Sequence, residues 1–175
     1  MYYDYSAMPT SPDALMRRLS DLKIPYDLHH HEAVFTVAQS DKISASITAL
    51  HTRNMFLRTK KKENYLVTLS DETPIDLKKL SDLLECGRFS FGSPDRLFEH
   101  LGVYPGSVTP LSVINAQPHA VTIILEKSMM DADVVAYHPL QNTMTVTMKP
   151  DDLLKFIKAC GHEYAIVDLS AAAPD

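Results

Sequence analysis

The sequence predicts a single α/β or α+β domain built around one mixed sheet, and three observations lead to this prediction. Helix-start signals alternate along the chain with apolar runs of strand length, so helices and strands interleave. The chain has 175 residues, of which 45% are hydrophobic and 22% charged, enough to bury a sizeable core. No internal repeat divides it. We therefore expect a flexible N-terminus over residues 1–10, one domain over 11–170 and a short tail over 171–175.

Four helices are predicted from the residues that begin them. A helix from Ser11 to about Leu22 has a hydroxyl N-cap and a proline at its first position. Further helices are expected from Asp76 to about Leu84, from Ser93 to Gly102 and from Pro150 to Gly161, the last two ending at a glycine. The segment Gln39 to Leu50 has helical spacing of apolar residues but many β-branched or small polar ones, so its structure is left open.

The strands are predicted from short apolar runs. Arg53 to Thr59 and Tyr65 to Leu69 flank a polar, basic turn and make a hairpin. Both strands are apolar on both faces, which places them in the centre of a covered sheet. The other expected extended segments are Tyr26 to His31, Val34 to Val37, Arg88 to Phe91, Val121 to Leu125, Val134 to Tyr137, Met144 to Met148 and Tyr164 to Asp168.

The positions of the cations in this hairpin are the most informative functional feature. The net charge of about −5 repels a polyanion, so any contact with nucleic acid needs a local basic patch. Arg53 and Arg58 lie within an apolar strand, where desolvating a guanidinium is costly unless acceptors compensate it, so this strand is expected to face a ligand. Lys60 to Lys62 follow it. The alternative is a solvated hairpin tip. A second candidate patch consists of Arg17, Arg18 and Lys23.

Several common classes of site find no support in the sequence. Cys86 and Cys160 are far apart and have no Cys-x-x-Cys partner, which disfavours a disulfide framework or a zinc-thiolate site. The run His29 to His31 resembles a metal cluster, but alternation along a strand would put only two of these side chains on one face. No phosphate-binding glycine loop or nucleophile elbow occurs. We therefore expect neither a metal ion nor a cofactor.

The location of the protein is predicted from what the chain lacks. The N-terminal residues have no apolar signal region, and no apolar run approaches the roughly 20 residues of a membrane span. The separated cysteines agree with a reducing compartment. We expect a cytoplasmic protein that does not associate with a membrane.

Two loops carry residues suited to a binding site. The segment Gly102 to Pro110 combines glycines, prolines and hydroxyls after a helix, so its backbone N–H groups could hold a carbonyl or an oxyanion. The alternative is a helix cap that only reverses the chain. The segment Tyr137 to Asn142 follows a strand and brings His138 together with a carboxamide. The alternative there is a structural histidine beside a proline.

The order and the residue sequences of these segments resemble those of a known family. The segments that carry the resemblance are Arg53-Asn54-Met55-Phe56-Leu57-Arg58 with Lys60-Lys61, Tyr65-Leu66-Val67-Thr68, Gly102-x-x-Pro105-Gly106-Ser107-Val108-Thr109 and His138-Pro139-Leu140-x-Asn142. Together they resemble the YbaK/ProX-type aminoacyl-tRNA deacylases, which are free-standing relatives of the editing domain of bacterial prolyl-tRNA synthetases. The resemblance runs from about Leu15 to about Leu169 and is strongest to the branch that removes alanine from proline tRNA.

The resemblance implies a fold and an activity. The fold would be a mixed, mostly antiparallel central sheet flanked by helices. The activity would be hydrolysis of the ester of a mischarged tRNA, without a metal, with the ribose hydroxyl of the tRNA helping to activate water. The partner would be the acceptor end of an aminoacyl-tRNA, and docking on prolyl-tRNA synthetase or an elongation factor stays open. The family suggests a monomer or a weak dimer.

The same resemblance implies roles for individual residues. Arg53, Gly106 and His138 would be catalytic; the loop of Gly106 would donate N–H groups to the ester or hold the aminoacyl group, and His138 would position the substrate. Asn142 would fix its loop or bind the terminal ribose. The expected substrate-binding residues are Phe35, Asn54, Arg58, Gly102, Pro105, Ser107, Thr109 and Asn142, and the expected tRNA-binding residues are Lys60, Lys61 and Lys62.

Two departures from the family pattern matter. Arg53 stands where the family usually has a lysine, and a planar guanidinium is not equivalent to a compact ammonium. The run His31-Glu32-Ala33 stands where relatives often have His-Pro-Pro, beside the expected specificity pocket. Three outcomes follow for Arg53: it substitutes for the lysine, the site takes another aminoacyl group, or only binding remains. The alternative function is therefore a catalytically silent module that binds the tRNA end.

Overall fold

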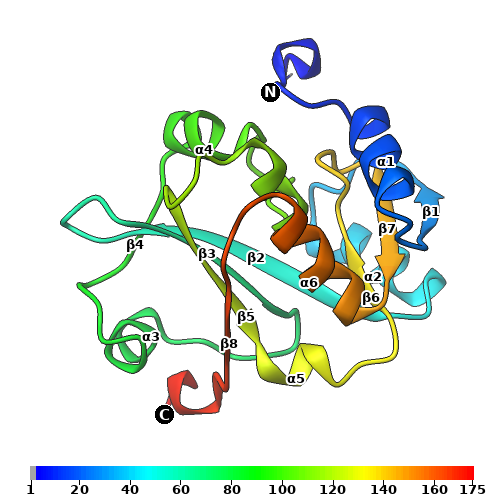
Figure 1. Ribbon diagram of the computed structural model, residues 1–175. Helices are drawn as coiled ribbons and strands as arrows, with labels where there is room; N and C mark the ends of the chain where they lie inside the picture. Colours follow the sequence, from blue (N-terminus) through cyan, green and yellow to red (C-terminus); the bar gives the residue numbers. More distant parts are fainter. Residues whose placement is uncertain (1–2) are drawn as a thin grey trace.

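The backbone of the computed structural model, described over residues 3–175, forms one eight-stranded sheet (Figure 1). The strand order is β1-β7-β6-β2-β3-β5-β8, and β4 pairs with β2 beside this path. Four of the seven strand pairings are antiparallel and three are parallel, so the predicted mixed, mostly antiparallel sheet is confirmed. The strands are β1 (Asp27–His30), β2 (Leu50–Arg58), β3 (Asn64–Ser70), β4 (Ser90–Phe91), β5 (Val121–Glu126), β6 (Val135–Tyr137), β7 (Met144–Met148) and β8 (Ala165–Val167).

The helices begin where the sequence signals them. The side chains of Ser11, Asp76 and Ser93 cap the first, third and fourth α-helices, and Gly102 ends the fourth in the left-handed conformation with φ +64°. The helices are α1 (Pro12–Asp21), α2 (Val37–Ser46), α3 (Leu77–Leu83), α4 (Pro94–Leu101), α5 (Lys127–Met130) and α6 (Pro150–Ala159), with 3₁₀ helices η1 (Tyr5–Ala7), η2 (Pro110–Asn115) and η3 (Ser170–Ala172). Among the described residues, no helix is both long and apolar enough to cross a membrane.

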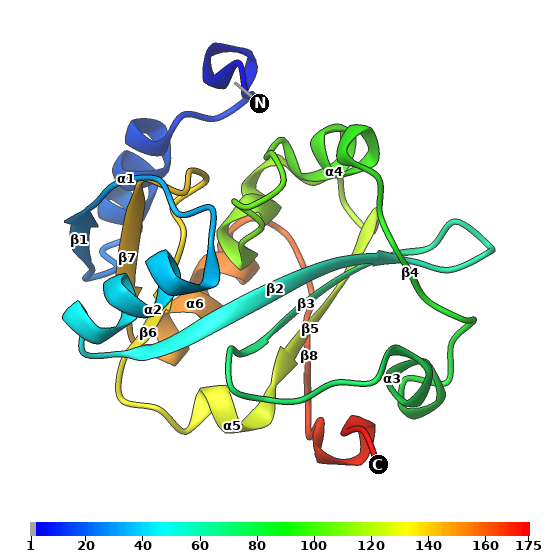
Figure 2. The same cartoon turned by 180° about the vertical axis from the view of Figure 1, so that it is seen from behind.

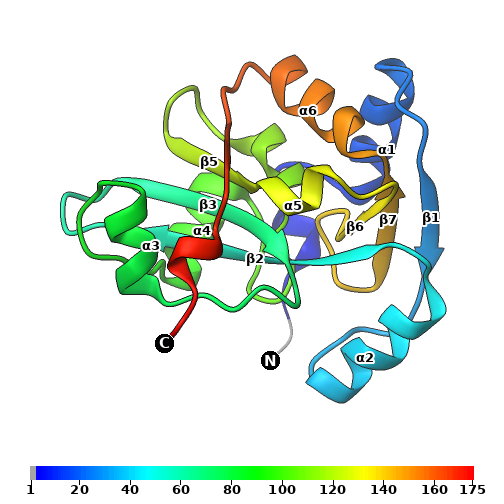
Figure 3. The same ribbon diagram turned by 90° about the horizontal axis from the view of Figure 1, so that it is seen from below.

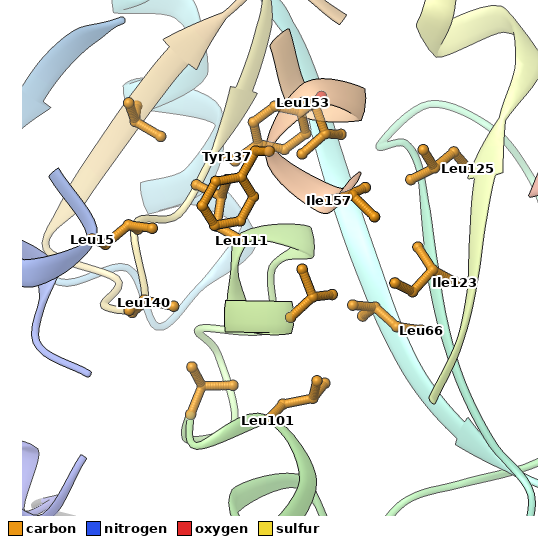
Figure 4. Close-up of a cluster of buried hydrophobic side chains, with 14 of the residues drawn as sticks. Leu15, Leu66, Leu101, Leu111, Ile123, Leu125, Tyr137, Leu140, Leu153 and Ile157 are labelled. Atoms are coloured by element: carbon orange, nitrogen blue, oxygen red, sulfur yellow. The ribbon is translucent and has the colours of Figure 1, made fainter. Parts of the chain in front are cut away.

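The main core lies on one face of the sheet. Helices α1, α4, α6 and η2 bury their apolar sides there against residues from five of the strands. Figure 4 shows the ring of Tyr137 beside Leu111 and Leu153 in this cluster. Burial raises the pKa of the Tyr137 hydroxyl far above its ordinary range. A smaller core lies on the second face, where α3 and η3 cover part of β2, β3 and β5.

The long strand β2 connects the two halves of the sheet (Figure 2). It pairs with β3 along seven residue pairs, which confirms the predicted hairpin. Phe56 belongs to the main core, whereas Met55 and Leu57 belong to the smaller core on the second face. Both faces of β2 are therefore covered in its middle, as its apolar pattern predicts.

Over β6 and β7, the second face of the sheet carries small side chains rather than a packed core. Alternation along these strands sends Val135, Tyr137 and Val146 into the main core and leaves Ala136 and Thr145 on the second face. These side chains are small, and α2 lies over them without a buried residue of its own. Figure 3 shows α2 on the side of the sheet away from α1 and α6. The small side chains leave space beneath α2.

Some predicted elements differ from the structure. Val34 to Val37 is not extended throughout, because Thr36 and Gln39 form a reciprocal capping box that starts α2 at Val37. The ambiguous segment Gln39 to Leu50 resolves into the rest of that helix and the start of β2. Of the expected strand Arg88 to Phe91, only the last two residues pair with β2.

The two chain ends contact the domain. In the expected flexible N-terminus, Met8 is buried and the ring of Tyr3 stacks on Tyr104 at 4.5 Å, while residues 1–2 lie outside the described part of the chain. At the other end, the expected boundary after residue 170 runs through η3. Ala172 is buried, and its carbonyl accepts a hydrogen bond from the N–H of Asp76.

Candidate functional site

A cavity of about 150 Å³ lies between α2 and the second face of the sheet. Its floor comes from the first half of β2, from the end of β6 and from β7, and Ile43 of α2 faces it from the opposite side. The residues of the cavity that matter for its chemistry are His31, His51, Arg53, Asn54, His138 and Thr145. Three of the expected site residues, Arg53, Asn54 and His138, therefore line the same cavity.

The cavity opens where β2 changes partners. Strand β6 pairs with β2 only as far as His51, and β4 begins to pair with the same edge at Leu57. Between these points, no strand in the part of the chain that the structure describes pairs with this edge of β2. The N–H of Leu50 and the carbonyl of Phe56 both point to this edge, because they bond to Val134 and Gly92. By alternation, the backbone groups of Asn54 point there too.

Arg53 and Asn54 are held by neighbours on the β3 side. The Nη2 of exposed Arg53 donates to the carbonyl oxygen of Thr73 at 2.6 Å, which leaves its other N–H groups for a ligand. Asn54 accepts a hydrogen bond at Oδ1 from the hydroxyl of Thr68 at 2.7 Å. This bond orients the carboxamide, so that Nδ2 is the group available as a donor. By alternation Arg53 shares its face of β2 with Met55, whereas the Asn54 side chain shares its face with Phe56. The side-chain donor on the second face is therefore the Arg53 guanidinium, and Asn54 adds its backbone N–H at the open edge of β2.

His138 is a neutral, oriented imidazole. Its Nδ1 lies 3.1 Å from the carbonyl oxygen of Met144, and because a carbonyl can only accept, Nδ1 carries the hydrogen. Burial lowers the pKa of His138 below its ordinary value, and His31 and His51 lower it further, while the Met144 carbonyl acts in the opposite direction. The unprotonated Nε2 is therefore a hydrogen-bond acceptor for a water molecule or an amino group.

Two further histidines, His31 and His51, line the cavity. His31 contacts the carbonyl of Glu32 through Nδ1 at 2.8 Å and the hydroxyl of Thr145 through Nε2 at 2.9 Å. Both nitrogens of His31 are thus engaged. His51 donates from Nε2 to the carbonyl of Ile47 at 2.9 Å. Within residues 3–175, no three His, Cys, Asp or Glu side chains are grouped so as to hold a metal ion.

Asn142 ties together the segments around the cavity. It is 4% exposed, and its Nδ2 donates to the carbonyl of Val34 at 3.1 Å. Val34 lines the cavity, and the next residue, Phe35, is 74% exposed outside it. A Cβ atom at Gly106 would lie 3.7 Å from the same Nδ2. Gly106 therefore reaches the site only through Asn142.

The rest of the loop Gly102 to Thr109 has structural contacts. Gly102 leaves no room for a side chain, since a Cβ atom there would lie 2.5 Å from Pro9. Thr109 is fully buried and caps η2 through its hydroxyl, and Ser107 is buried too. Gly102, Pro105, Ser107 and Thr109 do not line the cavity. The loop was expected to face the ester directly, but in the structure it lies outside the cavity.

Arg58 and the three lysines lie at the far end of β2. Arg58 is five residues from Arg53 along an extended strand, which corresponds to roughly 17 Å. Lys60, Lys61 and Lys62 are exposed in the turn that follows. In the described chain, none of these four cations lies within 4.0 Å of a carboxylate. They form a basic surface separate from the cavity, which we call the basic tip.

The turn that carries the basic tip is braced. Arg96 donates from Nε to Asn64 and from Nη2 to the carbonyl of Lys62, both at 2.7 Å. The hydroxyl of Thr59 donates to the carboxylate of Glu63 at 2.8 Å. Lys62 itself has a positive φ of 64°, which is costly for a residue with a side chain. The lysine side chains therefore project from a fixed backbone.

Sequence reasoning missed several residues of the cavity. His51, Asp71, Ile43 and Thr145 line it, yet none was a candidate. A signal was present in the strand Met144–Met148, where threonines alternate with residues of the main core. Such a small, polar face on a buried strand indicates space or a ligand on that side.

Comparisons with known proteins agree with one another. The aminoacyl-tRNA editing domain family matches residues 31–156. The prolyl-tRNA editing protein ProX of Acetoanaerobium sticklandii is 34% identical over 157 residues, which is 89% of this chain and 96% of that protein. The mouse prolyl-tRNA synthetase associated domain-containing protein 1 is 32% identical over 159 residues, covering 88% and 94%.

A solved structure shares the fold. It is a crystal structure of a candidate trans-editing enzyme for prolyl-tRNA synthetase, and it superposes with a TM-score of 0.68 at 16% identity. The superposition covers 90% of this chain and 96% of that one. At this level of identity the likeness concerns the fold alone. The match of residues 31–156 includes the whole cavity wall from His31 to Thr145.

Proposed function

Because this chain belongs to the aminoacyl-tRNA editing domain family, we propose that it is a trans-editing deacylase that hydrolyses the ester of a mischarged tRNA. The observation that carries the proposal is the meeting of Arg53, Asn54 and His138 in one small cavity at the open edge of β2. The reaction adds water across the ester. The bond between the carbonyl carbon and the ribose oxygen breaks, and that oxygen takes a proton from the water.

The size of the cavity supports a small amino acid as the group removed, and we propose alanine on proline tRNA. Its volume of about 150 Å³ is well below the ~300–1,000 Å³ of pockets for drug-sized ligands. A synthetase gains only about 1–3 kcal/mol of discrimination per methylene, so small wrong amino acids need a second site. The ProX relative is named as a prolyl-tRNA editing protein. Ile43 and Val34 would limit the length of the side chain that fits.

The polar groups support a division of roles. The Arg53 guanidinium and the backbone N–H of Asn54 at the open edge of β2 are donors, so they would stabilise the negative charge that develops on the carbonyl oxygen. His138 would accept a hydrogen bond at Nε2 from the substrate amino group or from the attacking water. The ribose hydroxyl of the tRNA would help to activate that water, so the protein supplies mainly position and charge.

Gly106 and Asn142 would act on the shape of the cavity rather than on the ester. Asn142 holds the carbonyl of Val34, and Gly106 leaves room for Asn142. Phe35 lies outside the cavity, where an exposed aromatic ring can stack on an unpaired base of the acceptor end. On this proposal Gly106, Asn142 and Phe35 would contribute to substrate binding without contacting the ester.

The basic tip would bind the phosphates of the acceptor stem. Its cations have no carboxylate partner in the described chain, although the protein as a whole is acidic. Phosphate contacts supply affinity and depend on salt. The distance of roughly 17 Å along β2 separates the tip from the cavity, so base-paired nucleotides would contact the tip while the unpaired end enters the cavity. Arg58 belongs to this surface.

A catalytically silent module remains a second candidate because of Arg53. Its guanidinium is engaged by the Thr73 carbonyl at 2.6 Å, and arginine stands where the family usually has lysine. The test is deacylation of a panel of mischarged tRNAs by the purified protein, with alanyl-tRNA for proline as the expected substrate. Retention of the charge on every tRNA, together with salt-sensitive binding to the acceptor end, would favour the silent module.

A further inference from the structure

Glu126 is a buried carboxyl group outside the cavity, and its two oxygens bond to a single turn. It ends β5 and is 5% exposed. One oxygen, Oε2, accepts from the backbone N–H of Ser70, and the other, Oε1, accepts from the hydroxyl of Thr73, both at 2.7 Å. Burying a carboxyl group is costly unless its oxygens are bonded, so this arrangement fixes Glu126 and the turn together.

The same turn contacts the candidate site in two places. The carbonyl of Thr73 holds the guanidinium of Arg53, and Asp71 lines the cavity while its N–H donates to the carbonyl of His51 at 3.0 Å. Glu126 and Arg53 lie on strands that are separated by β3. The hydroxyl and the carbonyl of Thr73 therefore link a buried acid on one strand to a cation of the site on another.

Closing the turn does not require Glu126. The N–H of Thr73 already donates to the carbonyl of Ser70 at 3.1 Å, which is the bond that defines a β-turn. What Glu126 adds is the orientation of residue 73 relative to the sheet. A side chain with several rotatable bonds, such as that of Arg53, is effective at a reacting carbonyl only when it is held in place.

We propose that Glu126 is a positioning residue for Arg53, acting through Thr73. It fixes the turn after β3 so that the Thr73 carbonyl holds the guanidinium on the β3 side of the cavity. The proposal rests on the proposed function only for its kinetic readout, because the geometry of Arg53 can be followed without turnover.

The kinetic test is a double-mutant cycle between Glu126→Ala and Arg53→Gln. Glu126→Ala should lower kcat/KM about 10-fold in the native background but less than about 2-fold once Arg53 is replaced. The reason is that Glu126 acts through Arg53, so its effect is lost with that side chain. Glu126→Gln should restore most of the activity, since its amide can accept from Ser70 and donate to the Thr73 hydroxyl. An equal loss from Glu126→Ala in both backgrounds would show that Glu126 supports only the fold.

The second test follows the Arg53 side chain directly. The guanidinium Nη–H resonances of Arg53, which include the hydrogen donated to Thr73, are assigned by their absence in Arg53→Lys, and their rate of exchange with solvent is measured by NMR. Glu126→Ala and Thr73→Val should speed this exchange, whereas Thr73→Ser should not. Glu63→Ala is the matched control, because Glu63 accepts from the hydroxyl of Thr59 in the turn at the other end of the hairpin.

The two tests separate this proposal from the proposed function. Unchanged exchange at Arg53 in Glu126→Ala and Thr73→Val would overturn the positioning role even in an active enzyme. Faster exchange in a protein that deacylates no tRNA would support the positioning role and contradict the deacylase. If Glu126→Ala fails to fold, Thr73→Val, which keeps the carbonyl and removes only the hydroxyl, decides both tests.

Discussion

The imidazole rings of His31 and His138 lie 6.5 Å apart between their centroids, and each ring has its Nδ1 against a main-chain carbonyl. Because a carbonyl only accepts, Nδ1 of each ring carries a hydrogen and donates it, in His31 to Glu32 and in His138 to Met144. A proton added to His138 would sit on Nε2, near a second imidazole. Burial, and to a smaller extent the neighbouring His31, lowers the pKa of His138, so the site keeps this histidine neutral.

The first prediction concerns pH. The pKa of His138 lies below its ordinary value of 6.5, so it stays neutral through neutral pH and its acceptor is lost only as the pH falls below the lowered pKa. We expect kcat/KM to fall on the acidic side, with a midpoint below 6.5. His138→Ala should reduce kcat/KM on the order of 100-fold and remove this acidic limb. A limb centred above 6.5 in the native enzyme would contradict the assignment.

The same shift affects stability. Because the folded pKa is lowered, the unfolded chain takes up the proton first as the pH falls below 6.5. The contribution of neutral His138 to stability is therefore complete above this pH and is lost as the pH falls through the folded pKa. Urea unfolding at several pH values should show a smaller loss in His138→Gln than in the native protein, and an equal loss would exclude His138 as the cause.

A second prediction concerns Arg53. A lysine at this position would keep the charge but has one terminal nitrogen, which would have to serve both the Thr73 carbonyl and the substrate. We therefore expect Arg53→Lys to lower kcat/KM about 10-fold, and Arg53→Gln to lower it further. Steady-state kinetics on one mischarged tRNA would measure both. A large gain with lysine would instead mark a decayed ancestral site.

A third prediction concerns the basic tip. Replacing Lys60, Lys61 and Lys62 together by alanine should weaken binding of the tRNA and reduce its dependence on salt by about 0.7–0.9 in log–log slope for each phosphate that is no longer neutralised. Hydrolysis of a short aminoacylated CCA trinucleotide should not change, because it does not reach the tip. Arg17 and Arg18, on α1, provide a matched pair of cations away from β2. If hydrolysis of the trinucleotide fell as much as that of the full tRNA, the three lysines would act on the reaction in the cavity rather than on tRNA binding.

A fourth prediction separates the roles of two glycines. Gly102 has φ +64°, and an added Cβ would lie 2.5 Å from Pro9 and 2.7 Å from Asn115. Gly161 has φ +83° with no atom within 4 Å of an added Cβ. Gly161→Ala should cost about 1 kcal/mol from its backbone alone, and Gly102→Ala about 2–3 kcal/mol. Thermal unfolding of both variants measures the difference. Equal losses of stability in the two variants would show that Pro9 and Asn115 can move aside from the added Cβ at little cost.

Much of the fold could be predicted because local signals determine it. The hydroxyl of Ser11 and the carboxylate of Asp76 mark helix starts, and the apolar residues of β2 and β3 mark a central hairpin. The sequence leaves helix α2 open because the helical spacing of its apolar residues is offset by β-branched and small polar ones, and the helix buries no side chain that would strengthen the pattern.

The candidate site could be predicted only in part. Arg53, Asn54 and His138 were expected together and line one cavity, but His51 and Thr145 join it through strand pairing that local sequence does not reveal. Arg58 looks like a neighbour of Arg53 in the sequence. Each residue of a strand advances about 3.3 Å, so the two cations belong to different surfaces.

The continuity of β2 constrains how such a protein can vary. One residue inserted between Arg53 and Arg58 would turn every later side chain of the strand to the opposite face and exchange the contents of the two cores. An insertion after Thr59 would alter neither core, because that turn lies beyond the paired residues. Length can therefore change in evolution at the turn but not within the strand, and the reach of the basic tip can be adjusted while the cavity is inherited intact.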